Sequence, residues 1–178
     1  MLGEVPLLRV TAWRFMLRKV ILMLSPIAVL IVGFALSAQT DETPSFPKEF
    51  RKWAHVKSVL VGPQSAAFAT EGGIHHIYAN VKGLEGYDSG KFADGSVIVY
   101  DLLETNEVAG NTIEGQTRRV DVMVKQSDRH SSTGGWEFMS FSRNDQTNGS
   151  LTAARQAICA GCHAHKKDHD FIFSEFRK

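Results

Sequence analysis

The sequence predicts an α+β fold built on a mostly antiparallel β-sheet, with a helix at its C-terminal end. Four strand-like segments follow one another along the chain, each preceded or followed by turn signals such as Gly72-Gly73, Asp94-Gly95 and Gly134-Gly135. An alanine-rich segment comes after the last of them. Strands joined by short connections pair antiparallel, because parallel pairing needs a long crossover.

The four expected strands are short and rich in β-branched and aromatic residues. They are Ile74–Asn80, Ser96–Leu103, Arg119–Lys125 and Trp136–Ser142. Valine occupies every second position in the third of these, which predicts that its other face is exposed to solvent.

Helical spacing appears at both ends of this region. Residues 48–57 place Phe50, Trp53, Ala54 and Lys57 on one side of a helix, and residues 81–87 form a short helix or a loop. The alanine-rich segment Leu151–His165 is expected to be the C-terminal helix. After it, four apolar residues are expected to pack back on the core: Phe171, Ile172, Phe173 and Phe176.

The C-terminal helix carries the most informative motif, Cys159-Ala160-Gly161-Cys162-His163. This is the C-x-x-C-H pattern at which c-type haem is covalently attached. Two cysteines three positions apart lie on roughly one side of a helix, where both thiols can add to the vinyl groups of one porphyrin. The imidazole of His163 can then bind the iron. The chain contains no other cysteine.

Three other interpretations of the motif are weaker. A structural zinc site would need further ligands from His163, His165 or His169, which leave little chain to wrap around a metal. A thioredoxin-like dithiol would follow an early strand of a βαβ unit, whereas this motif lies near the C-terminus. A plain disulfide does not explain the adjacent histidine.

The N-terminal residues predict export. Arg9, Arg14, Arg18 and Lys19 precede an apolar run over residues 20–36, which ends in small residues. We interpret residues 1–38 as a cleaved signal peptide or, alternatively, an N-terminal membrane anchor. Residues 39–47 form a linker, and residues 48–178 form one domain, expected in the periplasm. The net charge of +1 and the lack of a long basic run argue against nucleic acid as a partner.

The predicted domain resembles the cytochrome P460 family, which includes cytochrome P460 itself and the β-type cytochromes c′. The resemblance spans the whole domain and preserves the order of its motifs. These are Phe50-Arg51-Lys52-Trp53, residues 74–80 with Tyr78, residues 90–97, Gly135-Trp136-Glu137-Phe138, residues 159–163 and the C-terminal residues 171–176. It implies a mostly antiparallel β domain with one covalently attached haem c, held by Cys159 and Cys162, with His163 as the proximal ligand.

The resemblance also implies an open iron site for a small gaseous or nitrogenous ligand. Cytochrome P460 carries a lysine–haem cross-link, but Tyr100 stands at that position here, so the cross-link and enzymatic hydroxylamine oxidation are in doubt. Adjacent strand residues point to opposite faces, so at most one of His75 and His76 can face the haem, and the resemblance favours His75 on the distal side. Arg118 and Arg119 are candidates for a haem propionate.

Three functions follow as hypotheses. The first is a periplasmic mono-haem cytochrome that binds nitric oxide or a related nitrogen ligand. The second is an enzyme that oxidises hydroxylamine or nitric oxide, with His75, Tyr100 or an acidic residue as proton acceptor and another cytochrome as redox partner. The third is an electron-transfer cytochrome whose sixth iron ligand is a methionine or histidine, with Met123 and Met139 as candidates. Family analogy also suggests a homodimer.

Overall fold

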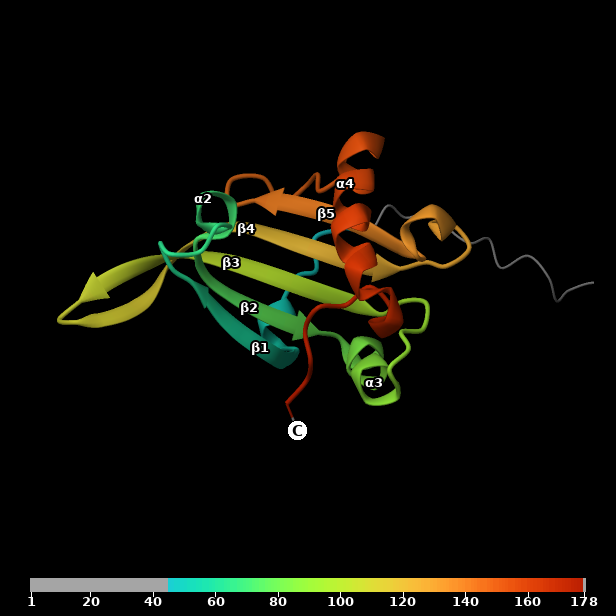
Figure 1. The fold of residues 1–178 in the computed structure, drawn as a ribbon, viewed down its shortest axis with the longest axis horizontal. Coiled ribbons are helices and arrows are strands. Elements are labelled where there is room, and N and C mark those ends of the chain that lie inside the picture. Colours follow the sequence, from blue (N-terminus) through green and yellow to red (C-terminus); the bar gives the residue numbers. More distant parts are fainter. Residues whose placement is uncertain (1–44, 178) are drawn as a thin grey trace, which may run out of the picture. The chain divides into compact units, whose positions relative to one another are not determined.

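The computed structural model describes residues 45–177 (Figure 1). Its elements follow the order η1 (Phe50–Lys52), β1 (Ala54–Val61), α2 (Phe68–Glu71), β2 (Gly73–Ala79), α3 (Val81–Ser89), β3 (Val97–Val108), β4 (Asn111–Lys125), η2 (Ser131–Thr133), β5 (Trp136–Ser142), α4 (Ala153–His163) and η3 (Ala164–His169), where η marks a 3-10 helix.

The strands form one five-stranded sheet in the order β1-β2-β3-β4-β5. All four neighbouring pairs are antiparallel, so the sheet is a meander whose edges are β1 and β5. The predicted α+β class and the C-terminal helix are confirmed. Figure 1 shows α4 crossing the face of the sheet, and the ends of β3 and β4 projecting beyond the other strands as a two-stranded ribbon.

The sheet has an apolar core on each face. One face, called here the α4 face, carries Ile98, Met123, Trp136 and Phe138, which pack with Ala160 of α4. The opposite face carries a second cluster that includes Val99, Val122 and Phe141, and it is covered by Phe46 and η1 residue Phe50. Strand alternation assigns each side chain to one of these faces.

The expected helix over residues 48–57 is wrong. Only η1 is helical, and Trp53 already has an extended backbone (φ −77°, ψ 177°). The rest of the segment belongs to β1, which contains Val56, Val59 and Val61 and pairs with β2 along its length. β-Branched residues suit a pleated strand, and the ladder of hydrogen bonds outweighs the weak helical spacing.

Strands β2 and β5 and helix α4 lie close to the predicted elements, whereas α2 was not predicted. Two strands are longer than predicted: β3 continues past Leu103 to Val108, and β4 begins at Asn111 and not at Arg119.

Residues 81–87 take the helical alternative. Helix α3 begins after Asn80, whose side chain accepts hydrogen bonds from the backbone N–H of Gly83 (2.8 Å) and of Val97 (3.0 Å). This caps the helix and ties it to the start of β3.

The prediction that residues 119–125 expose one face to solvent is also wrong. Val120 and Val122 are buried as expected, but Met123 and Lys125 on the other face are buried too. This end of β4 lies under the C-terminal segment, where Asp170 pairs with Lys125 (2.6 Å). Alternation predicts which residues share a face, but not what covers that face.

The C-terminal segment packs on the core largely as expected. Ile172 is buried, and Phe171 and Phe176 pack against the cluster on the α4 face, whereas Phe173 is 48% exposed. The Tyr87 hydroxyl and Ser174 share a hydrogen bond of 2.6 Å. Burial raises the pKa of Tyr87 to about 12. The segment therefore closes over α3 and the sheet after α4 has crossed it.

The predictions for the signal peptide or anchor (residues 1–38), and for most of the linker, lie outside the described residues. Within residues 45–177, no helix is both long and apolar enough to span a bilayer.

Replacing Leu102 with alanine tests the importance of the sheet core. Leu102 in β3 is fully buried, so Leu102→Ala should lower the free energy of unfolding by about 2–5 kcal/mol. The matched control is Leu60→Ala in β1, where the side chain is 57% exposed and the loss should stay below about 1 kcal/mol. Denaturant unfolding of both variants measures the difference, and equal losses would contradict the assigned core.

Candidate haem site

Helix α4 is held in a defined orientation against the edge of the sheet. Thr152 caps its N-terminus by accepting a hydrogen bond from the backbone N–H of Arg155. The Gln156 side chain then binds edge strand β5 at both backbone groups of Phe138: its Nε2 donates to the carbonyl (2.7 Å) and its Oε1 accepts from the N–H (3.0 Å). The Gln156 side chain thus makes the two hydrogen bonds that the backbone of a sixth strand would make with this edge of the sheet.

The two cysteines differ in their surroundings. Cys159 lies one turn after Gln156, is half-buried, and packs against the core of the α4 face. Cys162 is exposed, and both thiols are free. Burial raises the pKa of the Cys159 thiol, and the Asp121 carboxylate adds to this increase. The Cys159 sulfur is therefore present as a thiol, next to the sheet.

His163 is the last residue of α4, and its two ring nitrogens have different roles. Nδ1 lies 2.7 Å from the backbone carbonyl of Phe171, which can only accept, so Nδ1 carries the hydrogen. The ring packs between Phe138 and Phe173, with 5.1 Å between centroids in each case. Burial lowers the pKa of His163, although the hydrogen bond to Phe171 opposes this. The imidazole is neutral, and Nε2 has a lone pair for a metal.

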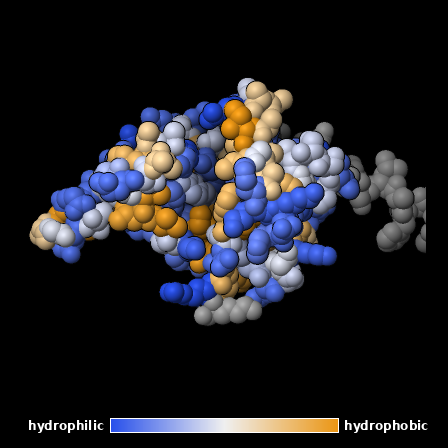
Figure 2. Space-filling model, in the orientation of Figure 1, coloured by the Kyte–Doolittle hydropathy of each residue, from blue (hydrophilic) through white to orange (hydrophobic). Residues whose placement is uncertain are grey.

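These residues fit a c-type haem. The chemistry needs two thiols near each other on a helix and a neutral histidine with a fixed tautomer. Apolar side chains near the motif are exposed in a way that suits a porphyrin: Ile158 is 62% exposed and Phe173 is 48% exposed. Figure 2 shows the surface hollowed between α2 and α4, with apolar residues along the α4 side.

The two distal candidates, His75 and Tyr100, are neighbours on the α4 face. His75 is buried, and its Nε2 lies 2.6 Å from the Glu71 carbonyl and 2.9 Å from the Tyr100 hydroxyl. The carbonyl only accepts, so Nε2 carries the hydrogen. Tyr100 then donates its hydroxyl hydrogen to Glu71 Oε2 (2.8 Å). His76 points to the opposite face, as alternation predicts, where it contacts Ser58 and Glu114.

Charged residues extend this contact across the sheet. Arg119 donates to Glu71 Oε2 (2.6 Å) and to Asp121 Oδ2 (2.7 Å), and Ser140 donates to Asp121 Oδ1 (2.6 Å). We call Glu71, His75, Tyr100, Arg119 and Asp121 the Tyr100 network. It connects α2 with β2, β3 and β4, and it engages the Arg119 side chain that the sequence suggested for a haem propionate.

Protonation in the network follows from burial and pairing. Burial, then the hydrogen bond to Glu71, raises the pKa of Tyr100, so the phenol keeps its proton. Burial alone would raise the pKa of Glu71, but hydrogen bonds from Arg119 and Tyr100 outweigh it and the pKa is lowered. At neutral pH, Glu71 is therefore an ionised acceptor beside a phenol that donates.

Sequence reasoning did not find Gln156, Glu71 or Asp121. Gln156 lies seven residues before His163 on the same side of the helix, a spacing that could have indicated it. Asp121 shares a face of β4 with Arg119 and Met123, two residues to either side of it, a spacing that could have indicated it. Glu71 gives no signal in the sequence, because it reaches Tyr100 only through the turn at Gly72-Gly73.

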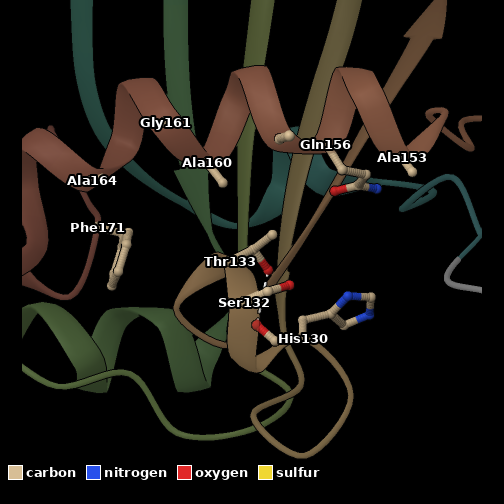
Figure 3. Close-up of a pocket in the computed structure, with 10 residues that line it drawn as sticks. His130, Ser132, Thr133, Ala153, Gln156, Ala160, Gly161, Ala164 and Phe171 are labelled. Atoms are coloured by element: carbon tan, nitrogen blue, oxygen red, sulfur yellow. Dashed lines mark hydrogen bonds between the residues drawn. The ribbon is translucent and has the colours of Figure 1, made fainter.

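A pocket of about 510 Å³ lies on another side of α4 (Figure 3). Ala153, Ala160 and Ala164 line it on the helix, opposite His130 and Thr133. Since successive helix residues are 100° apart, Cys162 points away from it. This pocket is therefore separate from the haem site. In the part of the chain that the structure describes, no group of three or more His, Cys, Asp or Glu side chains is arranged to hold a metal ion.

Comparison with protein families identifies the family of this chain. Residues 47–174 match the family model of cytochrome P460, which covers the sheet, α4 and most of the C-terminal segment. A search of curated proteins found no match.

Replacing His163 with alanine tests its assignment as the proximal ligand. His163→Ala should keep the mass of the covalent haem, because both thiols remain, but should lose the axial imidazole. Mass spectrometry of the purified protein measures the first outcome, and the optical spectrum measures the second. The matched control is His165→Ala, since His165 is exposed on the same segment. The assignment would be contradicted if His163→Ala kept an axial imidazole while His165→Ala lost it.

The pairing of Glu71 predicts a pH-dependent contribution to stability. Its pKa is lower in the folded chain, so the contribution is present above the ordinary value of 4.5 and is lost as the pH falls through the folded value. Glu71→Gln should lower the free energy of unfolding by about 1 kcal/mol at pH 7. It should have no effect at a pH low enough for Glu71 to be protonated in the folded chain. Unfolding curves across this pH range measure it. Glu49→Gln, at an exposed pair with Lys52, should change little at any pH, and a Glu71→Gln deficit that persists in acid would contradict the assignment.

Proposed function

Because the chain belongs to the cytochrome P460 family and is a c-type haem cytochrome of that family, we propose that it binds nitric oxide or a related small nitrogen ligand at an open iron site. Cys159 and Cys162 would hold the haem, and Nε2 of His163 would bind its iron. When bound, the iron supplies a coordination position for the ligand. The protein's residues set the orientation, polarity and hydrogen bonding around that position.

One observation carries the proposal of an open site: the candidate sixth ligands have other roles. Met139 is buried in the core on the face opposite α4, and Met123 is packed against Trp136 and Phe138. The Nε2 of His75 is engaged with Glu71 and Tyr100. This arrangement favours a ligand-binding site over a six-coordinate electron carrier.

The Tyr100 network favours one second candidate function, the oxidation of hydroxylamine. That reaction requires removal of protons as well as electrons from the substrate. The ionised carboxylate of Glu71 accepts a hydrogen bond from the Tyr100 hydroxyl, which in turn contacts Nε2 of His75, so Glu71 can accept a proton passed through Tyr100. The electrons would pass to a redox partner such as another cytochrome. Tyr100 at the cross-linking position still argues against the family's lysine–haem bond.

The setting of this function follows from residues 1–38. We propose that they export the domain to the periplasm, as a cleaved signal peptide or as an anchor, and that the haem is attached there. A homodimer remains a proposal from family analogy.

The optical spectrum of the purified ferrous protein tests the proposed function. The open site predicts high-spin bands that shift when nitric oxide is added, and Tyr100 predicts that a strongly red-shifted Soret band is absent. Sharp low-spin bands that ignore nitric oxide would contradict the open site. A red-shifted band, together with reduction of an added cytochrome when hydroxylamine is supplied, would favour the enzymatic alternative. Glu71→Gln should then slow that reduction at least tenfold, whereas Glu49→Gln should not.

A further inference from the structure

We propose that Asp170 is a positioning residue for His163, acting through the carbonyl of Phe171. The proposal rests on His163 being the iron ligand, as in the proposed function. His163 donates through Nδ1 to the Phe171 carbonyl (2.7 Å), which follows Asp170 directly in the chain. The position of that carbonyl therefore fixes the ring, and with it the direction of the Nε2 lone pair.

The backbone at this carbonyl has an unusual conformation. Asp170 (φ 50°) and Phe171 (φ 67°) both lie in the left-handed region, and neither is glycine. Two consecutive residues of this kind are strained, and such a conformation persists where the surrounding structure holds it. It turns the chain sharply at the end of η3, so that the Phe171 carbonyl points back to His163.

Asp170 supplies the contacts that hold this turn. Its carboxylate accepts from Lys125 Nζ (2.6 Å) and from the backbone N–H of Phe92 (2.9 Å). Its own carbonyl accepts from Trp136 Nε1 (2.9 Å). These donors come from β4, from the connection before β3, and from β5, so one residue is fixed from three directions. We call these contacts the Asp170 clasp.

The clasp is a buried feature and not a surface ion pair. The Lys125 side chain is 8% exposed, and that of Asp170 is 20% exposed. Lys125 also donates to the Gly134 carbonyl (3.0 Å), and its ammonium lies 5.0 Å from the centre of the Trp136 ring. A buried ammonium strongly favours a carboxylate beside it. Asp170 is thus held in place far more firmly than an exposed residue would be.

The consequence for the haem is electronic as well as geometric. A hydrogen bond from Nδ1 to a fixed acceptor makes the imidazole a stronger electron donor to a metal at Nε2. If the Phe171 carbonyl moves, the hydrogen bond from Nδ1 lengthens and the imidazole becomes a weaker electron donor to the metal. Weaker donation stabilises reduced iron over oxidised iron. Asp170 would therefore tune the iron without contacting it.

Asp170→Ala in the haem-loaded protein tests the proposal. The iron–histidine stretching band of the ferrous protein, measured by resonance Raman, should shift to lower frequency, and the midpoint potential should rise. The matched control is Asp101→Ala, because Asp101 is also buried and paired, with Arg51, but lies on the opposite face of the sheet. That variant should lose stability and leave both signals unchanged.

Trp136→Phe provides a second test if Asp170→Ala does not load haem. It removes the Nε1 donor of the clasp, keeps an aromatic ring in the core, and should shift both signals in the same direction by a smaller amount. Unchanged signals in the haem-loaded variants would overturn the proposal, and so would equal shifts in Asp101→Ala. Absence of an iron–histidine band in the unmodified protein would instead overturn the role of His163 and the function that depends on it.

Discussion

The attachment of α4 to edge strand β5 is the constraint on which the rest of the site depends. Cysteines and histidine on a free helix would have no fixed relation to the sheet. Gln156 removes this freedom, because its side chain occupies both backbone groups of Phe138 while Ala160 packs into the core behind it. Helix and sheet thereby become one rigid support, and the residues that follow Gln156 at helical spacing inherit its orientation.

Strand alternation divides the sheet into two faces with separate tasks. The opposite face is filled by an apolar cluster around Val122 and Phe141, which stabilises the fold. On the α4 face, an apolar region lies under α4, and the charged Tyr100 network lies toward α2. The C-x-x-C-H motif of α4 and the Tyr100 network therefore lie on the same face of the sheet, although they come from distant parts of the sequence.

Much of this arrangement could be predicted from residue pattern, and the failures have clear causes. The motif at Cys159–His163 and the strand at residues 136–142 depend on local features that tertiary structure does not override. The helix expected over residues 48–57 does not form, because pairing with β2 determines the conformation of residues 54–57. The charged residues around Tyr100 could not be predicted from the sequence for a related reason. Glu71 and Asp121 come close to Tyr100 only after the strands are placed next to each other.

The two thiols of the motif have unequal surroundings. Cys162 is exposed, whereas Cys159 is half-buried and packs against the core of the α4 face. Burial also raises the pKa of the Cys159 thiol, which leaves less of the reactive thiolate. A thiol reagent added to the folded, haem-free domain should therefore modify Cys162 before Cys159.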